Sequence, residues 1–270
     1  MYSFESKIRY SETGSDRHLT VPALLNYFQD CSTAQSEDLG IGLDYLEPQG
    51  QAWVLNFWQC DITRLPILGE TVVVATRPYE FKGVMGSRNY EMRDQDGNRM
   101  AVANTLYTLM NMEKHVPVKP DDKMKQAYQI GEKMVMDYVS RKIRFPEGGQ
   151  ALEPITIQQH HLDTNDHVNN VQYVSMAQDL IPKDLRIGRV LASYHISAVE
   201  GDVIYPYLFE LPADSSVGSQ AAAPLGTRAD SFYKEQKTPE AGQPLVFTKK
   251  IGVDLRREDG ESFCKVLFCG

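Results

Sequence analysis

Cysteine is scarce in this sequence, and no cysteine stands where a metal site or a disulfide framework would need it. The four cysteines, Cys31, Cys60, Cys264 and Cys269, form no CxxC pair and have no histidine at zinc-ligand spacing. Their number and spacing give no support to a metal site or a disulfide scaffold. They are typical of a protein from a reducing compartment.

Long hydrophobic runs, a strong positive charge and the common nucleotide motifs are also missing. No apolar run approaches the roughly 20 residues of a membrane span, and the opening MYSFESKIRYSETG lacks the apolar stretch of a signal peptide. The formal net charge of −8 and the pI of about 5.3 argue against a nucleic-acid partner or an anionic-membrane surface. No Gly-x-Ser-x-Gly elbow, phosphate loop or dinucleotide fingerprint occurs. We therefore expect a soluble, cytoplasmic protein with no membrane span and no nucleic-acid partner.

The densest basic cluster interrupts this acidic background. It consists of Arg141, Lys142 and Arg144. It is interpreted either as the solvated face of a connecting segment or as a local patch for an acidic partner.

The pattern over residues 1–118 predicts one helix and a sheet that wraps it. Thr20 and Pro22 indicate a helix start, and the helix then runs to Gly40. Alternating or β-rich segments predict strands over 4–10, 53–63, 70–81, 86–94 and 99–112. A long helix beside an antiparallel meander indicates the α+β class.

The same order of elements returns after a connecting segment, so the chain contains an internal repeat. Residues 119–150 are expected to be a linker, with a possible helix over 124–143, and residues 151–270 a second unit. The second unit has a predicted helix over 171–182 and a loop over 212–227. Its predicted strands are 152–162, 189–197, 202–211, 228–236, 244–258 and 261–268.

The bend before the second predicted helix gathers the polar side chains that matter for chemistry. Asp163, Asn165 and His167 alternate there, and in an extended stretch alternate residues point to the same side. The free N–H groups of Val168 and Asn169 at the helix start are expected to add an oxyanion-stabilising site. A carboxylate or imidazole to activate water and donors for a developing oxyanion suit thioester hydrolysis.

Two simpler interpretations stand beside this one. Asn165 or Asp166 would cap the second helix without any catalytic role. His18, which precedes the first helix, is interpreted as its entry residue.

At this point the sequence resembles the acyl-ACP thioesterase family of plants and bacteria. The segment LDTNDHVNNVQYV at 162–174 is similar to that family's signature. In the first half, WVL at 53–55, DITRLP at 61–66 with the following Gly-Glu at 69–70, and residues 86–111 resemble family strands. The likeness runs from near the N-terminus to about residue 205.

The resemblance implies a tandem, or double, hot-dog fold, each unit an antiparallel sheet wrapped around a long central helix. It implies that Asp163 activates water or attacks directly, that Asn165 polarises the carbonyl, and that His167 orients the nucleophile and shuttles the proton. It also implies that the first hot-dog shapes the acyl-chain pocket. Candidate lining residues there are Leu24, Leu25, Phe28 and Trp53, although ordinary core packing explains them equally well.

One departure from the family pattern stands after the strand tyrosine, Tyr194. Where the family usually has glutamate, and plant forms often a cysteine beside it, this chain has Ser197 and Ala198. The resemblance then implies that Ser197 holds water in place of the acid, that Glu200 substitutes for it, or that activity is reduced.

The leading hypothesis is therefore hydrolysis of fatty acyl-ACP thioesters in fatty acid biosynthesis, with acyl carrier protein as partner and neither a metal nor an organic cofactor. An acyl-CoA thioesterase and a non-catalytic hot-dog that binds acyl chains or carrier protein are the alternatives. Either a monomer or a homodimer fits a chain that holds two hot-dogs.

Overall fold

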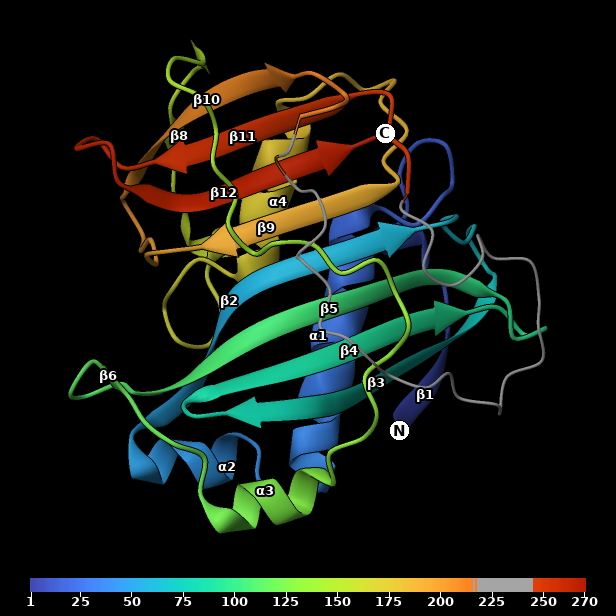
Figure 1. The fold of residues 1–270 in the computed structure, drawn as a ribbon, viewed down its shortest axis with the longest axis vertical. Helices are drawn as coiled ribbons and strands as arrows, with labels where there is room; N and C mark the ends of the chain where they lie inside the picture. The colour runs from blue at the N-terminus through green and yellow to red at the C-terminus, as the bar shows by residue number, and fades with distance from the viewer. Residues whose placement is uncertain (216, 218–244) are drawn as a thin grey trace.

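The computed structural model describes residues 1–215, 217 and 245–270, and its main feature is one continuous antiparallel sheet. The strand order is β1-β3-β4-β5-β2-β9-β12-β11-β10-β7, with β6 beside β5 and β8 beside β10. Figure 1 shows helices α1 and α4 on one face of this sheet and the connecting segment crossing the other. The strands are β1 (Tyr2–Lys7), β2 (Gln51–Ile62), β3 (Thr71–Lys82), β4 (Met85–Arg93), β5 (Arg99–Asn111), β6 (Val116–Pro117), β7 (Gln150–Ala151), β8 (Ile155–Thr156), β9 (Arg189–Tyr194), β10 (Val203–Leu211), β11 (Lys250–Arg256) and β12 (Ser262–Cys269).

Helix α1 (Val21–Asp38) begins and packs as its sequence predicts. The Thr20 hydroxyl accepts a hydrogen bond from the Ala23 N–H at 3.2 Å, and Pro22 lies in the first turn, where its missing N–H costs nothing. Its apolar face is fully buried against the sheet. The remaining helices are α2 (Leu43–Leu46), α3 (Asp122–Tyr128) and α4 (Asn170–Asp179), with 3-10 turns η1 (Tyr10–Glu12), η2 (Glu47–Gln49) and η3 (Gln159–His161).

The two halves join through strands β2 and β9, where a buried ion pair lies at the seam. Asp61 and Arg189 face each other across the two strands, with Nε to Oδ1 at 2.5 Å and Nη2 to Oδ2 at 2.9 Å. Asp137 of the connecting segment adds a third charge, 2.8 Å from the Arg189 Nη2. Because Arg189 is only 2% exposed, both carboxylates are needed to offset its desolvation.

After α3 the connecting segment is mostly irregular, so the expected helix over 124–143 is wrong beyond its first turns. Helix α3 ends at Tyr128, because Gln129 adopts a left-handed φ of 44° that cannot continue a right-handed helix. The rest crosses the sheet, where Gln59 Nε2 donates to the Asp137 carbonyl at 2.6 Å and Val139 N–H donates to Gln59 Oε1 at 3.1 Å.

Two loops of the same geometry precede α1 and α4, which confirms the internal repeat at the level of hydrogen bonds. In loop 14–18 the Gly14 N–H donates to the His18 carbonyl at 2.9 Å, and in loop 163–167 the Asp163 N–H donates to the His167 carbonyl at 2.8 Å. The fourth residue of each loop has a positive φ, 65° and 56°. Each loop also follows a 3-10 turn, η1 or η3.

Several predicted strands differ from the structure. The strand expected over 152–162 is largely wrong: Ile155–Thr156 pairs with β10 and Leu162 forms an isolated bridge with Val168, but Pro154 removes a donor and η3 occupies residues 159–161. The strand expected over 228–236 lies outside the described residues, as does nearly all of the loop expected over 212–227. Among the residues that the structure describes, no helix has the length and hydropathy needed to cross a membrane.

Candidate active site

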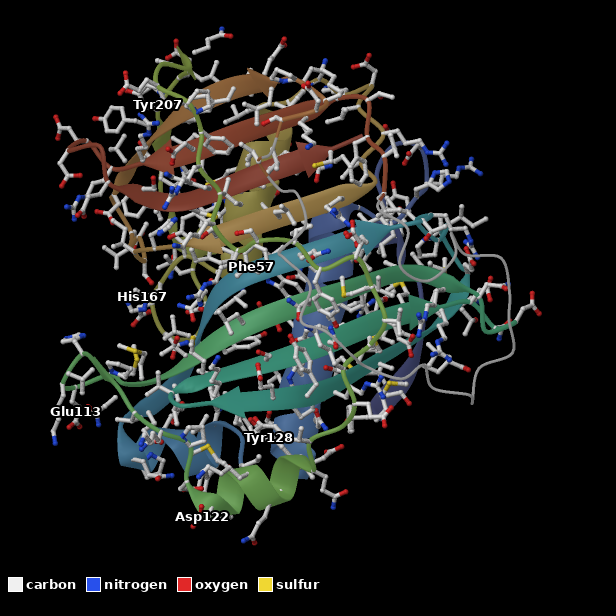
Figure 2. The ribbon with its side chains drawn as sticks, in the orientation of Figure 1. Phe57, Glu113, Asp122, Tyr128, His167 and Tyr207 are labelled. Carbon is white, nitrogen blue, oxygen red and sulfur yellow. The ribbon has the colours of Figure 1, made fainter. Side chains whose placement is uncertain are left out.

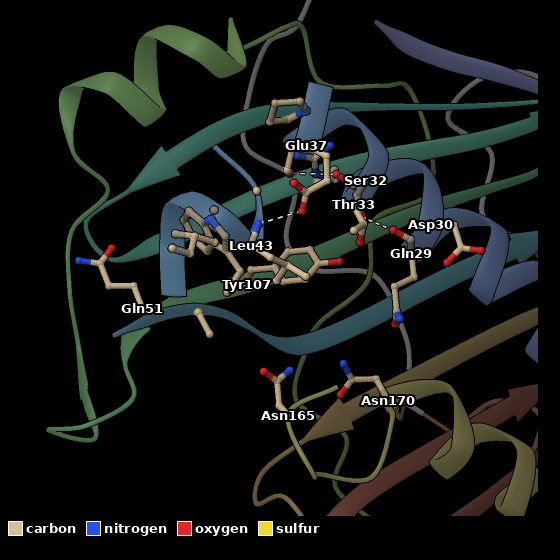
Figure 3. A pocket seen from close by; sticks show the side chains of 18 of the residues that line it. Gln29, Asp30, Ser32, Thr33, Glu37, Leu43, Gln51, Tyr107, Asn165 and Asn170 are labelled. Carbon is tan, nitrogen blue, oxygen red and sulfur yellow. Dashed lines mark hydrogen bonds between the residues drawn. The ribbon is translucent and has the colours of Figure 1, made fainter. Parts of the chain in front are cut away.

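A cavity of about 500 Å³ lies between the first half and the loop before α4 (Figure 3). One wall comes from α1, α2 and the ends of β2, β3, β4 and β5, and the other from residues 163–170. Its size is typical of a pocket for a small organic ligand. The lining includes Gln29, Asp30, Ser32, Thr33, Ser36, Glu37, Leu43, Leu46, Gln51, Trp53, Phe81, Arg88, Tyr107, Tyr128, Asp163, Thr164, Asn165, Asn169 and Asn170.

The wall from the first half has a polar and an aromatic part. Gln29, Ser32, Thr33 and Ser36 all line the cavity, and their spacing along α1 places them on one helix face. Aromatic side chains form the other part: the rings of Trp53 and Phe81 are stacked at 6.0 Å between centroids, and Tyr107 also lines the cavity.

The wall from the second half carries the predicted carboxylate and amide. Asp163 and Asn165 both line the cavity, and the Asn165 N–H donates to Asp163 Oδ1 at 2.8 Å, which fixes the carboxylate within its own turn. Figure 3 shows Asn165 and Asn170 facing the α1 side chains across the cavity. Asn170, the first residue of α4, was not among the candidate site residues from sequence.

The expectation that three alternate side chains converge fails for His167. The loop is a turn closed by the hydrogen bond from Asp163 N–H to the His167 carbonyl, and the φ of 56° at Asp166 breaks the extended alternation. His167 is not one of the residues that line the cavity. Figure 2 places it at the side of the molecule, on the loop between the two halves.

The expected free N–H groups are also wrong, because both are occupied. Val168 N–H donates to the Ala198 carbonyl and Asn169 N–H to the His161 carbonyl, each at 2.9 Å. The Asn169 side chain instead caps α4 by accepting from Val171 N–H at 2.9 Å. Within the described residues, Asn170 N–H meets no acceptor, and it lies at the positive end of the helix.

The residues at the family's glutamate and cysteine positions lie outside the cavity. Ser197 is exposed, and Glu200 lies in a turn with Gly201, whose φ is 86°. Ala198 is fully buried, and it anchors the loop because its carbonyl accepts from Val168 N–H.

Two tyrosines, the buried Tyr173 and the partly buried Tyr194, hold the start of α4 in place. Tyr194 donates its hydroxyl proton to the Asn170 carbonyl at 2.9 Å, and the Tyr173 hydroxyl accepts from Ala198 N–H at 2.8 Å. Burial raises the pKa of both phenols, so they act as neutral hydrogen-bonding groups at physiological pH.

The expected acyl-lining residues divide between core and cavity. Leu24, Leu25 and Phe28 are fully buried in the core around α1 and do not line the cavity, whereas Trp53 does. A sequence signal for the cavity lining was the polar stripe Gln29, Ser32, Thr33 and Ser36 on one face of α1, whose other face is apolar and buried. In the described part of the chain, no group of three or more His, Cys, Asp or Glu residues is placed to hold a metal ion.

Comparison with known proteins gives consistent matches over both halves. The family models described as the acyl-ACP thioesterase N-terminal domain and C-terminal domain match residues 1–128 and 147–200. A chloroplastic acyl-[acyl-carrier-protein] hydrolase of Cuphea viscosissima is 26% identical over 190 residues, covering 66% of this chain and 46% of the relative. The chloroplastic dodecanoyl-[acyl-carrier-protein] hydrolase of Umbellularia californica is 25% identical over 222 residues, covering 71% and 52%. The chain thus spans about half the length of these curated relatives.

Solved structures share the whole fold. An acyl-ACP thioesterase from Bacteroides thetaiotaomicron superimposes with a TM-score of 0.77 at 18% identity, covering 99% of this chain and 96% of the other. The 12:0-ACP thioesterase from Umbellularia californica gives 0.76 at 16% identity, covering 99% and 95%. The expected tandem hot-dog fold is therefore confirmed. The two family matches cover about two thirds of the sequence, and the chain belongs to the acyl-ACP thioesterase family.

Proposed function

We propose that this chain hydrolyses fatty acyl thioesters of acyl carrier protein and releases free fatty acid, as a step of fatty acid synthesis. Family membership supports the reaction class. The observation that carries the proposal is the placement of Asp163 and Asn165 together on one wall of the cavity of about 500 Å³, across from Trp53, Phe81 and Tyr107. Thioester hydrolysis needs a carboxylate to activate water, an amide to bind the carbonyl oxygen, and a cavity to hold the acyl chain.

In the proposed reaction, Asp163 takes a proton from water as the water oxygen bonds to the thioester carbon. The carbon–sulfur bond then breaks, and the departing sulfur receives that proton from Asp163, so the carboxylate is regenerated. The Asn165 amide and the Asn170 N–H are the donors for the carbonyl oxygen while it carries negative charge. The hydrogen bond from Asn165 N–H holds Oδ1, and Oδ2 of Asp163 is left to contact the water.

Acyl carrier protein is the proposed carrier. The basic cluster Arg141, Lys142 and Arg144 lines a second cavity of about 440 Å³ together with His195, and it supplies local positive charge for an acidic partner. Acyl-CoA is the alternative carrier, and direct comparison of the two carriers on the same acyl chain decides between them. We also propose a cytoplasmic location, which the four unpaired, buried cysteines support.

A non-catalytic protein that binds acyl chains is the second candidate. Two observations favour it: His167 lies off the cavity, and Ser197 is exposed where the family has a glutamate. The two candidates differ in one outcome: the enzyme releases free fatty acid from the thioester, and the binding protein does not.

The test is hydrolysis of acyl-ACP substrates from C8 to C18 by the wild-type chain and by Asp163→Ala. We expect free fatty acid from the wild type and a loss of about 10²–10⁴ in kcat from the variant. Binding of acyl chains with no release at any length would reject the enzyme and leave the binding protein.

A further inference from the structure

Arg88 places a buried positive charge on the wall of the proposed acyl cavity. It lies on β4 two residues before Tyr90, and both side chains face α1 because alternate strand residues point to the same side. Tyr90 belongs to the apolar core, whereas Arg88 is 7% exposed and lines the cavity. A charged guanidinium group therefore lines a cavity in which a bound, unsubstituted alkyl chain would gain most from apolar side chains.

The contacts of Arg88 are all neutral. Its Nη1 donates to Gln35 Oε1 and, at 3.2 Å, to Thr76 Oγ1, and the guanidinium lies 5.2 Å from the centroid of the Tyr128 ring. No carboxylate of residues 1–215, 217 or 245–270 forms an ion pair with it. The buried Arg189, in contrast, is held by two carboxylates.

Arg88 also leaves donors available to a ligand. The hydrogen bonds found for it within the described residues all come from Nη1, so Nε and Nη2 have no protein acceptor there. A saturated chain that filled the cavity would remove water from these donors and put nothing in its place, which is costly for a charged group. An oxygen on the chain would replace the water with a charge-assisted hydrogen bond.

Nearby hydroxyl groups extend this polar region. The Ser36 and Tyr128 hydroxyls are hydrogen-bonded at 2.9 Å, and both residues line the cavity, as does Ser32 one turn earlier on α1. The polar end of the cavity thus contains several groups that bind oxygen atoms, beside the rings of Tyr128 and Phe81, whose centroids are 5.8 Å apart.

The sheet order places this polar end away from the catalytic loop. The loop is anchored to Ala198, just beyond β9, and β4 lies three strands from β9, roughly 14 Å away at about 4.8 Å per strand. Arg88 therefore faces the distal part of a bound acyl chain and not the carbons beside the thioester.

We propose that the cavity selects acyl chains that carry an oxygen substituent (hydroxyl, oxo or carboxylate) on their distal carbons, with Arg88 as the residue that recognises it. This inference rests on the proposed function only in that the cavity holds the acyl chain. It names a substrate class narrower than fatty acyl thioesters in general, and it assigns Arg88 the choice between plain and oxygenated chains.

Binding of the product acids tests the proposal without needing turnover. Titration calorimetry would compare plain, ω-hydroxy and ω-carboxy acids of matched length from C8 to C14 on the wild-type chain. At one or more lengths, an oxygenated acid is expected to bind about tenfold more tightly than the plain acid or better. In Arg88→Met the ratio should fall to about one, because the plain acid no longer meets a desolvated charge.

Two further variants keep the result interpretable. Arg88→Lys keeps the charge but not the planar donor pair, so it should retain part of the preference for oxygenated acids. A partial preference in this variant shows that the loss in Arg88→Met does not come from misfolding. Arg257→Met, an exposed arginine on the β11–β12 turn, is the matched control and should keep the wild-type ratio.

Equal binding of plain and oxygenated acids at every length, or a preference that survives Arg88→Met, would overturn the proposal. Hydrolysis of the matching acyl-ACPs is measured in parallel. Absence of hydrolysis with an intact binding ratio would reject the proposed enzyme activity and leave the role of Arg88 standing.

Discussion

Gly14 and Asp163 occupy the same position in two copies of one loop. Each residue donates its N–H across the loop to the carbonyl of a histidine four positions later, at 2.9 Å to His18 and 2.8 Å to His167. The backbone is therefore alike in the two halves, and the side chains differ. Only the second loop has a carboxylate at its first position, and only that loop faces the cavity of about 500 Å³.

This relationship predicts which acidic side chain matters. Asp163→Asn removes the proton acceptor and keeps the size and the turn, so kcat should fall by about 10²–10⁴ with the fold intact. Asp16→Asn makes the same change in the first loop, outside the cavity, and should keep wild-type activity. Acyl-ACP hydrolysis is the measurement. Equal losses in the two variants would mean that the loops act through stability and not through chemistry.

His167 is expected to matter less than Asp163. Its ring does not line the cavity, and its backbone carbonyl, which any residue supplies, makes the contact that closes the loop. His167→Gln should lower kcat by about tenfold at most, against the larger loss for Asp163→Asn. His18→Gln is the matched control in the first loop. A loss as large as that of Asp163→Asn would show that the ring enters the cavity when substrate binds.

The sequence predicted elements well where one local rule was sufficient. Thr20 and Pro22 gave the start of α1 because capping and proline geometry depend only on neighbouring residues. The meander over residues 53–112 followed from β-branched and aromatic content and from the turn signals between its strands, with edges shifted by a residue or two. The linker helix failed because the left-handed Gln129 ends it, and a local pattern did not signal that conformation.

The site was predicted only in part, for the same reason. Asp163 and Asn165 lie together, but the alternation rule assumed an extended chain, and the turn at Asp166 directs His167 elsewhere. Asn170 and Arg88 enter the cavity through packing of distant strands and helices, which no window of sequence contains. The sequence pattern of Leu24, Leu25 and Phe28 fitted either an acyl-chain pocket or ordinary core packing. The structure shows that tertiary packing buries all three in the core.

The ion pair at the seam between the halves should dominate stability there. Asp61→Ala leaves the Arg189 guanidinium buried with one carboxylate in place of two, and loss of a partner from a buried pair costs about 3–5 kcal/mol. Urea unfolding should show this decrease in the free energy of unfolding. Asp259→Ala removes a partner from the exposed Arg257 and should cause no measurable change. A small effect of Asp61→Ala would mean that water enters the seam.

Core and cavity residues of the first half should separate in their effects. Leu24→Ala is expected to cost about 2–5 kcal/mol of stability by leaving a hole in the core, with an unchanged acyl-chain preference. Trp53→Ala enlarges the cavity itself and should shift the preferred chain length upward. Unfolding free energies and hydrolysis rates over C8 to C18 measure the two effects. A shift in the preferred chain length of Leu24→Ala would show that Leu24 contacts the bound acyl chain.

Glu70 should make stability depend on pH in the acid range. Two hydrogen bonds from Arg64, at 2.7 and 3.1 Å, lower the pKa of Glu70 below its ordinary value, and a third comes from Ile67 N–H at 3.0 Å. Because the folded state holds the charged form, its contribution is complete above the unfolded pKa of about 4.3. It is lost as pH falls through the lower folded pKa, where the carboxylate is protonated in both states.

Glu70→Gln should therefore be less stable than the wild type at pH 7, and the difference should shrink as pH falls toward about 3. Thermal unfolding at pH 7, 5 and 3 measures it, with Glu153→Gln on an exposed loop as the matched control. If the deficit of Glu70→Gln is the same at pH 3 as at pH 7, the carboxylate charge is not the source of the stabilisation. The loss of one accepting oxygen at this position would then be the cause, because glutamine has the same length as glutamate but only one oxygen to accept from Arg64 and Ile67.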